Sequence, residues 1–76
     1  MKILLADIRK SKLVTLKKLE NATGISKATL QRIEVGIVSP TMKNMEKIAK
    51  ALEVGIIDLF ESKYKYFDKD SFSEQK

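Results

Sequence analysis

The stretch 15–36 constrains this chain more than any other, because its pattern predicts two short helices joined by a tight turn. The first helix is expected at 16–22, and Gly24 stands where the end of a helix favours a residue that tolerates a left-handed backbone. Ser26 is expected to cap the second helix, since its hydroxyl can accept a hydrogen bond from a free amide of the first turn. Gly36 is expected to end that helix.

The helix expected at 27–35 has an apolar side and a polar side when its residues are placed about 100° apart. Leu30 and Ile33 share the apolar side. The other side is formed or flanked by Lys27, Ala28, Thr29, Gln31, Arg32 and Val35. An ammonium, a methyl group, an amide and a guanidinium are groups that read base edges in a major groove, although most charged helix faces are only solvated. The pattern of this helix alone leaves both interpretations open.

Other residues that match a known family are spread along the segment 4–60 rather than confined to the turn. They are Arg9, Thr15, Leu19, Gly24, Ile25, Ser26, Thr29, Leu30, Ile33, Glu34, Gly36, Pro40, 48–52 and Leu59. With them the chain resembles the Cro and lambda-repressor-like (Xre-type) helix-turn-helix family. The resemblance implies an all-α fold, a compact five-helix DNA-binding domain whose second and third helices form the helix-turn-helix. The remaining helices are expected at 2–12, 42–52 and 56–61.

Length and composition narrow the function. Seventy-six residues allow one domain, which buries only about 60% of its unfolded surface. The chain has no cysteine and no histidine, so thiolate nucleophiles, imidazole bases and the commonest zinc ligands are absent. We therefore expect no enzyme activity, no cofactor and no metal. The longest apolar run, residues 3–6, is too short for a membrane span or signal peptide, which favours a cytoplasmic, nucleoid-associated protein.

The positive charge is concentrated in the part of the chain that is expected to fold. The net charge is +5; residues 1–60 hold eleven Lys and Arg against six Asp and Glu, whereas 61–76 hold four of each. This distribution suits a polyanionic partner such as nucleic acid. Many small lysine-rich domains are basic for solubility alone. Charge by itself therefore does not distinguish a nucleic-acid-binding protein from a protein whose charge serves only solubility.

Arg9 has two interpretations. It is a surface cation at the end of the helix expected at 2–12, or it forms the structural ion pair with Glu34 that the family resemblance implies. The chain also departs from the family's usual residues, with Leu13 in place of glycine, Leu16 in place of glutamine and Glu20 in place of alanine. The glutamine commonly binds a DNA phosphate, which leucine cannot do. For phosphate contacts we expect Lys17, Lys18, Ser26, Thr29, Ser39, Thr41, Lys43 and Asn44. For each of the last four, a solvated surface role is the alternative.

The C-terminal part differs in composition from the rest, since all five aromatic residues lie at or after Phe60. We divide the chain into a helix-turn-helix domain at 1–61 and a tail at 62–76. The tail is expected to support dimerisation to about residue 67, and 68–76 to be frayed. Its pattern fits an edge strand or a helical stripe equally well. The residues assigned to dimer contacts are Ile56, Phe60, Tyr64, Tyr66 and Phe67.

The leading hypothesis is a sequence-specific regulator of transcription, a repressor, that binds a palindromic operator in double-stranded DNA as a homodimer. Lys27, Ala28, Gln31 and Arg32 are its candidate base contacts. The alternative is an antitoxin-like module whose main partner is another protein, such as a toxin or a second regulator. Neither hypothesis involves a membrane.

Overall fold

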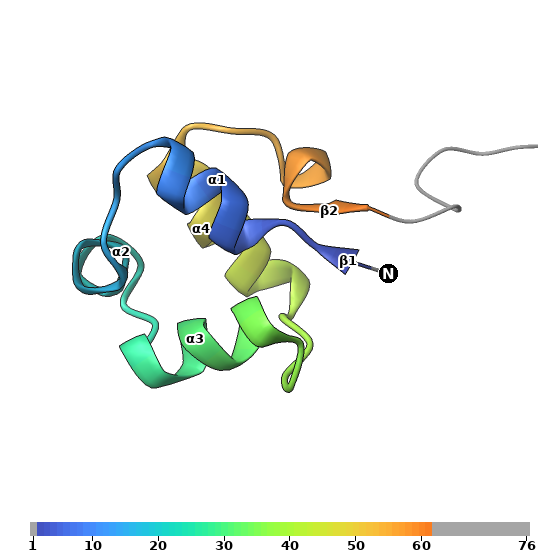
Figure 1. The fold of residues 1–76 in the computed structure, drawn as a ribbon, viewed down its shortest axis with the longest axis horizontal. Helices are drawn as coiled ribbons and strands as arrows, with labels where there is room; N and C mark the ends of the chain where they lie inside the picture. The colour runs from blue at the N-terminus through green and yellow to red at the C-terminus, as the bar shows by residue number, and fades with distance from the viewer. Residues whose placement is uncertain (1, 62–76) are drawn as a thin grey trace, which may run out of the picture.

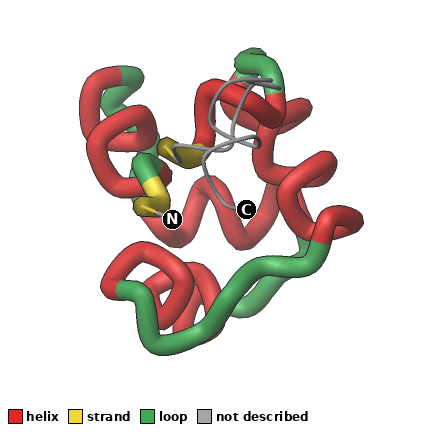
Figure 2. The backbone as a smooth tube through the Cα atoms, turned by 90° about the vertical axis from the view of Figure 1, so that its right-hand side faces the viewer, coloured by secondary structure: helices red, strands yellow, loops and turns green. Residues whose placement is uncertain are grey.

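The computed structural model describes residues 2–61 of this chain. Four α-helices make up most of this part: α1 (Leu5–Ser11), α2 (Leu16–Thr23), α3 (Lys27–Val35) and α4 (Met42–Leu52) (Figure 1). A 3₁₀ turn, η1 (Ile56–Leu59), leads into a short strand, β2 (Phe60–Glu61). This strand pairs antiparallel with β1 (Lys2–Ile3), with Lys2 opposite Glu61 and Ile3 opposite Phe60. The two strands are the short yellow segments in Figure 2.

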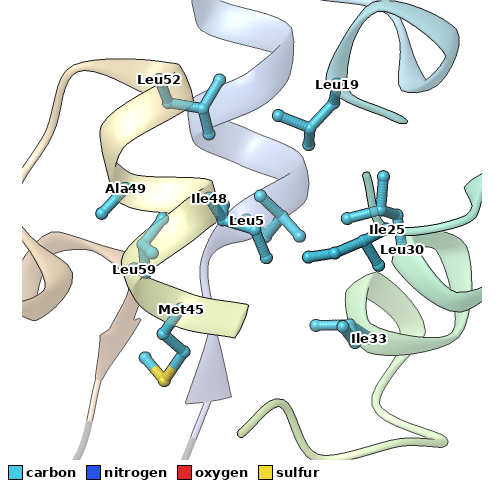
Figure 3. Close-up of a cluster of buried hydrophobic side chains, with 10 residues drawn as sticks. All are labelled: Leu5, Leu19, Ile25, Leu30, Ile33, Met45, Ile48, Ala49, Leu52 and Leu59. Atoms are coloured by element: carbon cyan, nitrogen blue, oxygen red, sulfur yellow. The ribbon is translucent and has the colours of Figure 1, made fainter. Parts of the chain in front are cut away.

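The core lies between the four helices, where apolar side chains from α4 meet those from α1, α2 and α3 (Figure 3). Leu30 of α3 is completely buried, and Leu5, Leu19 and Ile33 are each 1% exposed. The full buried set is Leu5, Leu19, Ile25, Leu30, Ile33, Met45, Ile48, Ala49, Leu52 and Leu59. The helix expected at 42–52 contributes Met45, Ile48, Ala49 and Leu52 to this set. Because α3 packs through only two core side chains, most of its remaining surface is available to other contacts.

The helix ends predicted at Gly24, Ser26 and Gly36 are confirmed. The side chains of Thr15, Ser26 and Thr41 accept hydrogen bonds from backbone amides in the first turns of α2, α3 and α4. Gly24 and Gly36 end α2 and α3 with φ of 77° and 87°. These φ values lie in the left-handed region, which glycine adopts without steric cost.

Two predicted helices are wrong, and with them the five-helix count. The helix expected at 2–12 is shorter, because the amide of Leu4 donates to the Leu59 carbonyl at 2.8 Å and the residues before it pair as strand β1. The helix expected at 56–61 is a single 3₁₀ turn, after which Phe60 is extended (φ −147°, ψ 160°) and joins that sheet. The described residues therefore contain four α-helices and a two-stranded sheet. The tail, 62–76, lies outside the described residues.

Candidate nucleic-acid interface

The outer face of α3 consists of the side chains that the helical pattern placed there. Lys27, Ala28, Gln31 and Arg32 are exposed, and Thr29 is half-buried. In the same helix Leu30 and Ile33 point into the core (Figure 3). The face is thus a polar, cationic strip whose backbone is held in place by the apolar contacts on the opposite side. Guanidinium, amide, ammonium and methyl groups presented on one rigid helix are suited to the edges of base pairs.

The beginning of α3 is fixed by hydroxyl groups. Ser26 Oγ accepts from the Thr29 amide at 3.2 Å and donates to Thr29 Oγ1 at 2.8 Å. Both hydroxyls were predicted as phosphate contacts, and both already take part in the cap. The Thr29 hydroxyl keeps its own proton to donate to a phosphate, whereas the Ser26 proton is already donated to Thr29 Oγ1.

Glu20 has a structural role that the sequence did not reveal. Its Oε2 accepts from the backbone amide of Lys27 at 2.8 Å, and its Oε1 accepts from Lys17 Nζ at 3.2 Å. The bond from the Lys27 amide, followed by that from Lys17, lowers the pKa of the Glu20 carboxyl below its ordinary value of 4.5. The carboxylate therefore joins α2 to the first turn of α3. The spacing of Lys17 and Glu20 signals their ion pair, but no local signal connects Glu20 to a residue seven positions later.

The remaining predicted phosphate contacts lie near the two ends of α3. Lys17 and Lys18 are exposed on α2, which lies beside the beginning of α3, and the link to α4 follows its end (Figure 1). On that link and the first turn of α4, Ser39, Thr41 and Lys43 are exposed and Asn44 is half-buried. Cations and hydroxyls on both sides of a groove-reading helix are the arrangement that positions such a helix on a duplex.

Arg9 and Glu34 fix the end of α3 to the end of α1. Arg9 Nε lies 2.6 Å from Glu34 Oε2, and Arg9 Nη2 donates to Glu34 Oε1 at 3.2 Å. The third guanidinium nitrogen donates to the Val14 carbonyl at 2.9 Å. The two side chains are only 12% and 8% exposed, and all of these contacts are internal. In this structure the pair is therefore part of the framework that supports α3.

The residues assigned to dimer contacts divide into two groups. Ile56 and Phe60 are half-buried and pack partly against the domain's own core. Tyr64, Tyr66 and Phe67 lie outside the described residues.

Other apolar side chains are more exposed. Those around the end of α3 and the link to α4 are Val35, Ile37, Val38 and Met42. Among residues 2–61, no helix has the length and apolar character needed to cross a lipid bilayer.

Comparison with known proteins agrees with this geometry. A family model described as helix-turn-helix matches residues 5–59. The chain belongs to the helix-turn-helix family. Within that family its domain is of the Cro and lambda-repressor-like type.

One curated relative and one solved structure illustrate the similarity. The chain is 31% identical over 68 residues to the HTH-type transcriptional regulator SlrR of Bacillus subtilis (strain 168). That match covers 88% of this chain but 45% of SlrR, so the chain spans about half the length of this relative. The solved SinR protein/SinI protein complex contains a chain with the same fold, at a TM-score of 0.70 and 25% identity. This structural match covers 93% of our chain and 70% of the matched chain in the complex.

The three departures from the helix-turn-helix pattern have different structural consequences. Leu16 packs against the core, so it contributes an apolar contact where the family often has a polar one. Glu20 turns outward to the start of α3. Leu13 is 86% exposed and has a φ of 59°, which explains why glycine is usual at this position.

Proposed function

We propose that this chain is a sequence-specific regulator that inserts α3 into the major groove of double-stranded DNA. The observation that supports this most directly is the exposed strip of Lys27, Ala28, Gln31 and Arg32 on a helix whose opposite side is buried. Arg32 would contact the O6 and N7 atoms of guanine, and Gln31 the N6 and N7 atoms of adenine. Lys27 would contact guanine or a phosphate, and Ala28 a thymine methyl group.

Cationic, hydroxyl and amide side chains at the two ends of α3 would bind the DNA backbone. They are Lys17, Lys18, Ser26, Thr29, Ser39, Thr41, Lys43 and Asn44. These contacts would set the orientation of α3 without reading sequence. We further propose that the protein represses transcription, because a domain that occupies operator DNA excludes polymerase from it.

A homodimer would place two copies of α3 in successive major grooves about 34 Å apart, so the operator would be palindromic. The proposed dimer contacts remain Ile56, Phe60, Tyr64, Tyr66 and Phe67. Sedimentation equilibrium of the full chain and of a chain lacking residues 62–76 tests this part. A dimer that becomes monomeric on truncation supports the assignment, whereas a full chain that is monomeric even on its selected operator contradicts it.

Selection from randomised duplexes, followed by sequencing, tests the base contacts. Arg32→Ala should relax the preference at one base pair of each half-site by about 1–3 kcal/mol, and Gln31→Ala should do the same at a neighbouring pair. Lys50→Ala is the matched control, because Lys50 is an exposed cation in the last turn of α4. It should leave the selected sequence unchanged. If Arg32→Ala and Gln31→Ala also leave it unchanged, the proposed readout is wrong.

A second candidate function is an antitoxin-like module that acts mainly through another protein, a toxin or a second regulator. Two observations favour it: one structural relative is a complex of two proteins, and apolar side chains are exposed around the end of α3. Truncation at residue 61 separates the two functions. If the truncated chain still dimerises and binds DNA but no longer binds a different protein partner, the second function is favoured.

A further inference from the structure

Glu20 is the one described carboxylate that holds two groups of the proposed DNA-binding surface at once. Its oxygens accept from the Lys17 ammonium at 3.2 Å and from the Lys27 amide at 2.8 Å. Lys17 is a candidate phosphate contact and Lys27 a candidate base contact. The Lys17 side chain is 69% exposed and that of Glu20 is 29% exposed, so the pair lies at the surface where α2 meets α3.

A carboxylate at this position competes with DNA. A phosphate that approaches Lys17 must displace Glu20 from the ammonium, and it also meets the negative charge of the carboxylate itself. An exposed ion pair of this kind shifts such a competition by up to about fivefold. Other described cations at the interface, including Lys18 and Lys43, have no carboxylate within ion-pairing distance in the structure.

The second hydrogen bond gives Glu20 a fixed position. The Lys27 amide belongs to the first turn of α3, where intrahelical partners are lacking. By accepting from it, Glu20 is anchored beside Lys17 rather than free to turn into solvent. Alanine, the residue usual at this position in the family, would provide neither contact.

We propose that Glu20 is a positioning residue that fixes the start of α3 and restrains Lys17, thereby lowering the affinity of the chain for DNA of arbitrary sequence. This inference rests on the proposed function. Phosphate contacts then contribute less to the binding free energy. The contacts of Gln31 and Arg32 with bases make up a larger fraction of the total.

The test is fluorescence anisotropy of the full chain with a generic duplex between about 50 and 200 mM salt, the range over which phosphate contacts change affinity strongly. Glu20→Gln keeps an oxygen for the Lys27 amide but removes the charge. It should bind the generic duplex about two- to fivefold more tightly, with a salt slope steeper by up to about 0.9 for each protomer. Glu53→Gln, which removes an exposed carboxylate at the end of α4, is the charge-matched control and should change affinity by less than twofold.

The route through Lys17 is tested by a double-mutant cycle. In a Lys17→Ala background, Glu20→Gln should raise generic affinity by a smaller factor, because only the direct repulsion between carboxylate and phosphate is then removed. The cycle overturns the inference if Glu20→Gln has the same effect with and without Lys17, or if Glu53→Gln raises affinity equally. If the unaltered chain and Glu20→Gln both bind DNA but with equal slopes, the inference fails while the proposed function stands. If neither binds any duplex at low salt, both fail.

A readout that does not depend on DNA completes the test. Nuclear magnetic resonance of the unaltered chain should show a Glu20 carboxyl with a lowered pKa, and Lys17→Ala should move that pKa toward its ordinary value. An unchanged Glu20 pKa in Lys17→Ala would mean that the two side chains do not interact in solution, and it would overturn the inference.

Discussion

Replacing Leu13 with glycine should stabilise this domain. Leu13 follows α1 and adopts a left-handed backbone, with φ of 59°. Its amide donates to the Lys10 carbonyl at 3.0 Å and the next amide, of Val14, donates to the Arg9 carbonyl at 3.1 Å. These two bonds are those of a Schellman motif, in which the left-handed position is usually occupied by glycine. The chain therefore has the bonds of the motif but not its preferred residue.

The expected change in the free energy of unfolding for Leu13→Gly is the sum of three contributions. A non-glycine residue in the left-handed region costs about 1–2 kcal/mol, and glycine removes this cost. Glycine also gives the unfolded chain more freedom, which opposes the gain by about 0.4–1 kcal/mol. The third term is small, because the Leu13 side chain is 86% exposed and loses little buried area on removal. The free energy of unfolding should rise by about 0.5–1 kcal/mol, and Tm by about 3–6 °C.

Thermal and urea unfolding, followed by far-ultraviolet circular dichroism, measure the effect. Two controls separate the backbone from the side chain. Leu13→Ala removes the same side chain but keeps the unfavourable φ, so its stability should stay within about 0.5 kcal/mol of the unaltered chain. Lys12→Gly places glycine one residue earlier, where φ is −94°, and should lower stability by about 0.5–1 kcal/mol. A lower Tm in Leu13→Gly, or an equal rise in Leu13→Ala, would refute the reasoning.

Three further predictions concern polar contacts. Glu34→Leu should lower the free energy of unfolding, measured in urea, by about 3 kcal/mol, because it leaves the Arg9 charge nearly buried and unpaired. Adding Arg9→Met should restore most of the loss. A double variant no more stable than the single one would contradict this. Thr23→Val should cost about 1–3 kcal/mol, since Thr23 Oγ1 accepts from the Ile25 amide at 3.1 Å in a buried turn; unchanged urea unfolding would argue against it. Because the pKa of Glu20 is lowered, by the Lys27 amide first and by Lys17 second, the stability it provides is complete well above pH 4.5. The difference between the unaltered chain and Glu20→Gln should disappear as pH falls through the folded pKa, and a difference that persists at lower pH would show that charge is not its cause.

The parts of the fold that the sequence predicted well are those set by neighbouring residues. The ends of α3 follow from Ser26 and Gly36, whose side-chain and backbone properties act within one turn. Its buried side follows from the spacing of Leu30 and Ile33. The exposed face of the candidate site was predicted for the same reason, because a helix that buries one side presents the other.

The parts that could not be predicted depend on residues far apart in the chain. Strand β1 exists because Lys2–Ile3 meets Phe60–Glu61, and two-residue strands have no periodicity to detect. The short apolar sequence before α1 fits a helix equally well in isolation. The contact from Glu20 to the Lys27 amide is a similar case, since it depends on the angle between α2 and α3. The pairing of Arg9 with Glu34 was available only through family resemblance.

The arrangement around α3 explains how a nine-residue helix with two buried side chains is held firmly enough to read DNA. Two core contacts fix its rotation but leave it free to tilt. The beginning of the helix is fixed by the Ser26 hydroxyl and the Glu20 carboxylate, and its end by the Arg9–Glu34 pair. Base readout requires side chains to be placed to within a fraction of an ångström. The polar contacts at the two ends thus hold the helix in one orientation, while none of them occupies the face that carries Gln31 and Arg32.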